Sequence, residues 1–134
     1  MPFEYTGVRV RNLARAVRFF TEGLGLKVGV AGRMAAGGLW QELYDEETHA
    51  ILELNYYPGD PPFRTGDELD HLGFRVSELD EVVERLVGLG ARLEIPPFEE
   101  GDMRLVFLSS PDGIWVELYE RRTVEEPPTS RPGS

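Results

Sequence analysis

The chain has 134 residues, of which 41% are hydrophobic, enough for one domain with a proper core and too few for two independent cores. It carries 14 basic and 24 acidic residues, so the net charge is −10. This charge repels nucleic-acid phosphates and attracts cations, which disfavours nucleic-acid binding. Cysteine is absent, which excludes disulfides, thiolate metal sites and a cysteine nucleophile. No targeting segment is visible and no apolar run approaches the roughly 20 residues of a membrane helix, so we expect a cytoplasmic protein without membrane contact.

An internal repeat organises the sequence. Residues 5–10 (YTGVRV) align with residues 71–76 (HLGFRV), and the Gly, the Arg and the last Val are identical. Apolar residues then recur at i, i+3, i+4 and i+7 in both copies, which predicts one amphipathic helix in each; they are Leu13, Ala16, Val17 and Phe20, and Leu79, Val82, Val83 and Leu86. After a slip of one residue, the Gly-Leu-Gly at 23–25 aligns with the Gly-Leu-Gly at 88–90 as a helix end.

The helix starts carry capping residues. Asn12 precedes the first predicted helix and is of a type that accepts hydrogen bonds from the first helical amides. Ser77 followed by Asp80 has the spacing of a capping box ahead of the second helix. We therefore predict side-chain caps from Asn12 and Ser77.

Each helix is followed by residues of period two, which predicts strands at 26–30, 38–44 and 50–57, and again at 92–94, 103–109 and 114–119. With one strand before each helix, each copy reads β-α-β-β-β. The predicted fold class is α+β: two tandem βαβββ modules forming a cupped, barrel-like mixed sheet with the helices outside. The predicted domain, 1–122, comprises module one at 3–57, a linker at 58–68 that is rich in Pro and Gly, and module two at 69–122; a flexible tail at 123–134 follows.

Four strand positions stand at equivalent places in the two copies: Tyr5, Glu53, His71 and Glu117. Both glutamates interrupt apolar strands, and a partly buried carboxylate needs a partner. One imidazole and two carboxylates suit a divalent Zn, Ni, Mn, Co or Fe ion. The sequence therefore nominates Glu53, His71 and Glu117 as metal ligands.

Each nominated residue also has an ordinary interpretation. Glu53 and Glu117 are also placed to pair with Arg9 or Arg75 across the sheet. Arg9 shares the face of Tyr5 and suits either a substrate carboxylate or a structural ion pair. Trp40 and Tyr57 are candidates for a pocket wall or for ordinary strand packing. The second histidine, at position 49, stands beside an acidic turn and is expected to be solvent-exposed.

Four segments resemble glyoxalase I and its relatives in the vicinal oxygen chelate superfamily, which includes bleomycin-resistance proteins and extradiol dioxygenases. They are Leu-Glu-Leu at 52–54, Val-Glu-Leu at 116–118, LDHLGF at 69–74 and PDGIWVE at 111–117, and the likeness spans 5 to about 120. In that family the four positions hold a metal in the order His (or Gln), Glu, His, Glu. Glu53, His71 and Glu117 match this order and Tyr5 departs from it. The resemblance implies three protein ligands, with Tyr5 donating a hydrogen bond to a bound oxygen.

The resemblance implies a metal-dependent glyoxalase I-like lyase or isomerase, of the lactoylglutathione-lyase or epimerase type. It would act on a small vicinal-oxygen substrate through an enediolate, with Glu117 or Glu53 moving the proton. Tyr5, Arg9, Trp40 and Tyr57 would bind the substrate. Two modules can close one site within a chain, or pair across a two-fold axis to build two sites in a dimer. The resemblance implies a homodimer, and two-fold dimers are the commonest oligomers.

Two alternatives remain open at this point. One is a metal-free small-molecule binding protein of the drug-sequestering, bleomycin-resistance type, which Tyr5 and the acidic surface favour. The other is a ring-cleaving dioxygenase, although such relatives use two histidines and one carboxylate.

Overall fold

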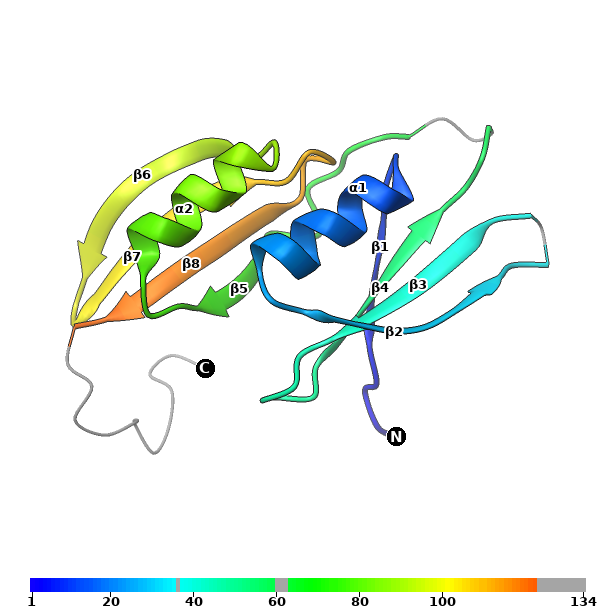
Figure 1. Ribbon diagram of the computed structural model, residues 1–134, viewed down its shortest axis with the longest axis horizontal. Coiled ribbons are helices and arrows are strands. Elements are labelled where there is room, and N and C mark those ends of the chain that lie inside the picture. The colour runs from blue at the N-terminus through cyan, green and yellow to red at the C-terminus, as the bar shows by residue number, and fades with distance from the viewer. Residues whose placement is uncertain (36, 60–62, 123–134) are drawn as a thin grey trace.

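The computed structural model describes residues 1–35, 37–59 and 63–122, so the tail predicted at 123–134 lies outside the described residues. Module one contains β1 (Thr6–Arg9), α1 (Leu13–Arg18), the π-helical turn η1 (Phe19–Gly23), β2 (Lys27–Arg33), β3 (Leu39–Tyr44) and β4 (Ile51–Tyr56). Module two contains β5 (Leu72–Arg75), α2 (Leu79–Gly88), β6 (Arg92–Glu100), β7 (Met103–Ser109) and β8 (Trp115–Arg121). The predicted α+β class and the two βαβββ modules are confirmed (Figure 1).

The described strands form two four-stranded sheets with the same topology, β1-β4-β3-β2 and β5-β8-β7-β6. In each sheet the strand that begins the module runs parallel to the strand that ends it, so β1 is parallel to β4 and β5 to β8. The other neighbouring strands are antiparallel. The expected mixed sheets are therefore present, but as two separate sheets that do not close into a barrel. The strands β1 and β5, which begin the two modules, lie at sheet edges.

One hydrophobic core serves both modules. Each helix contacts the last strand of its own sheet, and α2 also contacts η1 (Figure 1). At the point where η1 meets α2, a Cβ on Gly23 would lie 2.5 Å from Cδ2 of Leu86, so a larger residue would have to displace that buried side chain. The buried apolar side chains on the helix-facing sides of both sheets join the same cluster; they include Val8, Val10, Leu52, Leu54, Leu108, Val116 and Leu118.

The turn η1 explains the slip of one residue in the repeat. A π-helical turn accommodates one residue more than an α-helical turn, and it occurs in α1–η1 but not in α2. With this extra residue two consecutive aromatic rings are buried: Phe19 is 1% exposed and Phe20 is 0% exposed. Their ring centroids lie 5.2 Å apart in an edge-to-face arrangement.

Only one of the two predicted caps forms. Asn12 caps α1, since its Oδ1 accepts a hydrogen bond from the Arg15 amide at 3.0 Å, as predicted. The prediction for Ser77 is wrong: α2 begins after Glu78, with no side-chain cap from that residue. Instead the Leu79 amide donates to Oε2 of Glu120 at 3.3 Å, so a carboxylate from β8 takes over the capping role.

Strand β6 is longer than the predicted strand at 92–94, because it continues through Pro96 and Pro97 to Glu100. Proline cannot donate to a ladder, which argues against a central strand. Here β6 is an edge strand, and its register shifts between Leu93 and Phe98, so the prolines are tolerated.

The turn between β3 and β4 is held by Asp45, whose carboxylate accepts a hydrogen bond from the Thr48 amide at 2.7 Å. This bond lowers the pKa of Asp45 below its ordinary value. His49 closes the turn with a φ of 66° and is exposed. The next acidic residue of the turn, Glu47, pairs with Arg75 of module two at 2.8 Å.

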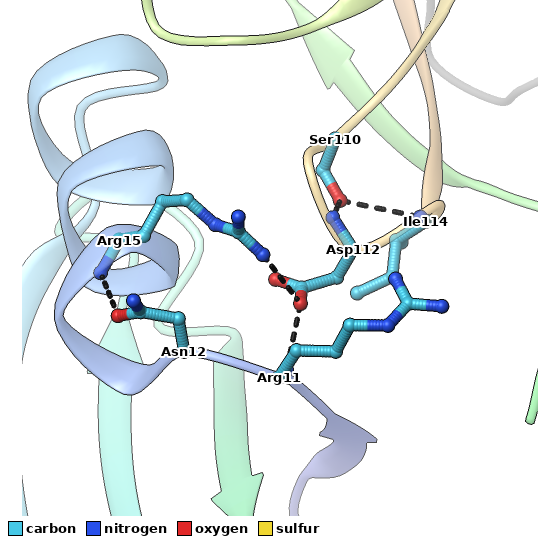
Figure 2. Close-up of polar contacts among 6 residues, drawn as sticks. All are labelled: Arg11, Asn12, Arg15, Ser110, Asp112 and Ile114. Atoms are coloured by element: carbon cyan, nitrogen blue, oxygen red, sulfur yellow. Dashed lines mark hydrogen bonds and ion pairs between the residues drawn. The ribbon is translucent and has the colours of Figure 1, made fainter. Parts of the chain in front are cut away.

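Asp112 joins the two modules at the opposite end (Figure 2). It lies in the turn before β8, is 2% exposed, and accepts hydrogen bonds from the Arg11 amide at 2.7 Å and from Nη2 of Arg15 at 3.3 Å. The turn itself is fixed by Oγ of Ser110, which accepts from the amides of Asp112 and Ile114 at 3.2 Å each. The start of α1 is thus attached to module two through one buried carboxylate.

We expect Asp112→Ala to lower the free energy of unfolding by about 1–3 kcal/mol, because it leaves the part-buried Arg11 amide without its acceptor. Urea denaturation followed by circular dichroism measures this. The control is Asp102→Ala, which removes a carboxylate that pairs with Arg121 on the surface and should cost less than about 1 kcal/mol. Equal costs for the two variants would contradict a special role for Asp112.

Candidate metal and substrate site

The two modules present equivalent glycine–carboxylate pairs on the sheet faces turned away from the core. Gly7 on β1 lies opposite Glu53 on β4, and Gly73 on β5 lies opposite Glu117 on β8. A Cβ on Gly7 would lie 3.8 Å from Oε2 of Glu53, and a Cβ on Gly73 would lie 3.6 Å from Oε1 of Glu117. Each edge strand therefore carries a glycine beside a carboxylate, and no side chain from that position covers the carboxylate oxygens; at Gly7 a Cβ would also lie 3.2 Å from Nδ2 of Asn55.

In module two the structure brings His71 and Glu117 together. Nε2 of His71 lies 3.1 Å from Oε1 of Glu117, and Nδ1 of the same ring lies 2.6 Å from Oδ1 of Asp70. The His71 and Glu117 side chains are 32% and 19% exposed, whereas Asp70 is 90% exposed. The imidazole thus bridges a solvated carboxylate and a largely buried one.

This geometry constrains what lies between His71 and Glu117. When the Nδ1 proton is donated to Asp70, the Nε2 lone pair faces a carboxylate oxygen. Two electron-pair donors in that arrangement are stabilised by a shared proton or by a metal cation. A metal-binding histidine commonly donates a hydrogen bond from its other ring nitrogen to a carboxylate, as Nδ1 of His71 is placed to do with Asp70. Ligand atoms on one ion lie about 3 Å apart, which agrees with the 3.1 Å separation.

Glu53, the third nominated ligand, lies on the other sheet. Across the ladder it faces Glu42 of β3, and its neighbour Asn55 donates to the Val8 carbonyl at 3.4 Å. In the described part of the chain, no group of three or more His, Asp or Glu side chains is close enough together to hold a metal. A single chain therefore joins His71 to Glu117 but does not bring Glu53 to them. Tyr5, just before β1, is 48% exposed.

The nominated substrate-binding residues of module one are already in contact with other groups. The Arg9 guanidinium lies 5.0 Å from the ring centroid of Tyr57 and 5.8 Å from that of Phe63, both within cation–π range. Trp40 packs over the backbone of Gly32, where a Cβ would lie 2.5 Å from the indole. The Trp40 ring is thus held against the sheet by a neighbouring glycine, which supports its packing role.

A cleft of about 790 Å³ lies between the modules, under the linker. It is lined on one side by Gly7 and Arg9 and on the other by Asp70 and Trp115, and residues 63–69 border it. Sequence reasoning did not single out Asp70 or Phe63. The adjacency of Asp70 to His71 was a usable signal, whereas the contacts of Phe63 depend on how the linker folds back.

No helix in the described residues is long and apolar enough to cross a membrane.

Residues 3–118 match the family model of the glyoxalase/bleomycin resistance protein/dioxygenase superfamily. A lactoylglutathione lyase of Salmonella typhimurium is 29% identical over 128 residues, which cover 88% of this chain and 91% of that protein. A probable chloroplastic lactoylglutathione lyase of Arabidopsis thaliana is 29% identical over 129 residues, 89% of this chain, which spans only 35% of that protein.

Among solved structures, a glyoxalase family protein of Bacillus cereus has the same fold, with a TM-score of 0.76 and 22% sequence identity. The match covers 92% of this chain and 95% of that one. Because the family model covers most of the sequence, from before β1 into β8, the chain belongs to the glyoxalase/bleomycin resistance protein/dioxygenase superfamily.

Proposed function

We propose that this protein is a metal-dependent glyoxalase I-like lyase or isomerase that acts on a small vicinal-oxygen substrate through an enediolate. The observation that carries the proposal is the arrangement Asp70–His71–Glu117, in which a supported imidazole and a largely buried carboxylate converge at 3.1 Å. The relatives named lactoylglutathione lyase support the reaction type. They make a glutathione thiohemiacetal of a 2-oxoaldehyde the first substrate to test.

His71 and Glu117 would hold the metal together with Glu53. A divalent ion bound there would act as a Lewis acid and stabilise the negative charge of the enediolate. Nitrogen and carboxylate oxygen donors suit Zn, Ni, Mn, Co or Fe. The donor set therefore fits the ion that the family implies.

We propose that a second copy of the chain completes the site. Glu53 is displayed on one sheet and the His71–Glu117 pair on the other, and both face away from the shared core. Strands β1 and β5, which carry the two glycines, are sheet edges with free ladder positions in the described chain. A two-fold axis would place Glu53 of one protomer against His71 and Glu117 of the other, and would build two equal sites.

The remaining steps belong to the chain's own side chains. Glu117 or Glu53 would take the proton from the substrate carbon and return it to the neighbouring carbon, as a general base and then a general acid. The Tyr5 hydroxyl would donate a hydrogen bond to a substrate oxygen. Arg9, which borders the cleft between the modules, would bind a substrate carboxylate.

A metal-free binding protein is the second candidate. Two observations favour it: Tyr5 stands where a ligand would be expected, and Glu53 lies apart from the His71–Glu117 pair in the single chain. The acidic chain, with its net charge of −10, would then suit a cationic ligand. Metal content separates the two candidates.

We expect about one divalent ion per chain after incubation with Ni²⁺, Zn²⁺ or Mn²⁺ and gel filtration, and its loss in His71→Ala, because the imidazole nitrogen is removed. Elemental analysis measures the content. The matched control is His49→Asn, which removes the other histidine and suits its φ of 66°. Wild-type protein without metal would favour the metal-free binding protein.

We expect Glu117→Gln to lower kcat by about 10²–10⁴-fold on a glutathione thiohemiacetal if Glu117 is the general base, because an amide does not accept the proton. Steady-state kinetics, with circular dichroism as a test of folding, measures the effect. Glu81→Gln on the exposed side of α2 is the control. Unchanged turnover in Glu117→Gln would rule out this role, and Glu53→Gln would then be the variant to examine.

A shared site makes a prediction for mixed variants. Glu53→Gln and His71→Ala homodimers each lack a ligand in both sites, but their heterodimer keeps one intact site. Unfolding and refolding an equimolar mixture should therefore restore about a quarter of wild-type activity and metal content, because half of the dimers are mixed and one of their two sites is whole. A site within one chain would show no recovery.

A further inference from the structure

A second cavity, of about 410 Å³, lies between the two modules. Module one contributes β1, the residues after η1, the β3–β4 turn and the start of β4 to its lining, and module two contributes β5 and Tyr119 of β8. None of the three proposed metal ligands, Glu53, His71 and Glu117, lines it. Its volume lies within the range of small-molecule pockets, which commonly form where two structural units meet.

Much of this cavity is lined by apolar side chains, because the common core reaches solvent there. The apolar lining comprises Leu24, Leu26, Leu52, Leu72, Phe74 and Val76. Leu26 and Leu52 are buried, whereas the others are partly buried and pack against the core. An apolar group that enters the cavity would therefore pack on side chains that the core already holds in place, and would lose its own contact with water.

The charged lining comes from the β3–β4 turn and from the end of β5. Glu47 and Arg75 pair with each other at 2.8 Å. Within the described residues, Asp45 pairs with no arginine or lysine, and its carboxylate accepts hydrogen bonds from Thr48. These bonds hold the pKa of Asp45 below its ordinary value, so the side chain is a carboxylate at neutral pH. The lining thus carries one more negative than positive charge.

This combination of apolar and charged groups selects among ligand classes. An anion would meet Asp45 and Glu47 and the net charge of −10 of the chain, which repel it and attract a cation. An ammonium group can donate hydrogen bonds to a carboxylate, and the hydroxyls of Thr6 and Tyr119, which also line the cavity, are further acceptors. Hydrogen bonds between charged groups are roughly twice as strong as those between neutral groups.

We propose that this cavity is a second ligand site, which binds a small primary amine that carries an apolar alkyl or aryl group. The ammonium group donates to Asp45, and the apolar group packs on the side chains that line the cavity. Asp45 determines the preference for a positive charge. The site goes beyond the proposed function and needs no metal, because it uses none of the three proposed metal ligands.

The test compares three probes of similar shape and different charge: phenethylamine, phenethyl alcohol and phenylacetate. Each is titrated into the full chain, labelled with ¹⁵N, with and without Zn²⁺, and amide shifts give both affinity and location. We expect the amine to bind about tenfold more tightly than the alcohol and phenylacetate to bind most weakly, with shifts in 45–52 and 72–76. Equal affinities, tighter binding of phenylacetate, no amine binding in the millimolar range, or shifts outside the cavity would overturn the proposal.

Asp45→Asn should abolish the preference for the amine over the alcohol. Asparagine keeps an oxygen that accepts from the Thr48 amide, so the turn is preserved while the charge is removed. The matched control is Asp102→Asn, which removes a carboxylate that pairs with Arg121 and does not line the cavity. It should leave the preference unchanged. A preference that survives Asp45→Asn, or that both variants reduce equally, would assign amine binding to general attraction by the acidic chain and overturn the proposal.

Glu47→Gln tests the same cavity from the other charge. It leaves Arg75 without its partner, so phenethylamine should bind more weakly and phenylacetate more tightly than in the wild type. The ion pair is exposed, so its loss should cost little stability, and this variant serves where Asp45→Asn does not fold. Unchanged affinity for both probes would place their binding elsewhere and contradict the proposed site.

Discussion

The two helices and the helix-facing sides of both sheets bury their apolar side chains in one common core, and the rest of the structure depends on this sharing. A domain of about 60 residues buries only about 60% of the surface that its unfolded chain exposes, so the common core gives each module burial that it would lack alone. The close contact at Gly23 lets η1 approach α2, and Asp112 fixes the start of α1 to the turn before β8. Because the core uses one face of each sheet, the other two faces remain available for binding.

Duplication gives those two free faces the same layout, and later divergence gives them different chemistry. Gly7 with Glu53 repeats Gly73 with Glu117, down to the ladder pairing. The position two residues before each glycine differs, being Tyr5 in module one and His71 in module two. Module two thereby gains a supported imidazole, and module one keeps a carboxylate with a phenol. The two faces therefore differ in their donor groups, and the proposed two-fold assembly would bring the carboxylate of one together with the imidazole of the other.

Two neighbouring side chains fix the orientation of the His71 ring. Asp70, on the same chain segment, holds one ring nitrogen, and Phe107 supports the ring from the side. Fixing the ring in this way points Nε2 at Glu117 without a large cost in side-chain entropy when a ligand binds. A proton or metal charge placed between Nε2 and Glu117 would be only partly screened, since Glu117 is 19% exposed.

The sequence by itself determined the α+β class, the two modules and most strands, because these depend on local periodicity and on a repeat visible in the letters. It also determined the Asn12 cap, which needs only a side-chain oxygen that accepts a hydrogen bond from an amide three residues further along. The prediction of a cap from Ser77 failed because the Leu79 amide donates to Glu120 instead. Glu120 is 41 residues away in the sequence, so no local pattern indicates this contact. The passage of β6 through two prolines was likewise not predictable, since only the sheet order makes β6 an edge.

For the site, the sequence identified His71 and Glu117 through the repeat, and the tertiary structure decided that they meet while Glu53 lies on the other sheet. Tertiary structure alone also brought Phe98, Phe107 and Trp115 together, because their contacts cross two ladders and their spacing in the chain carries no periodic signal. Local patterns determine which way a side chain points from its own strand. Which side chains then become neighbours depends on strand order and register, and these are fixed only when the sheets bury their faces against the shared core.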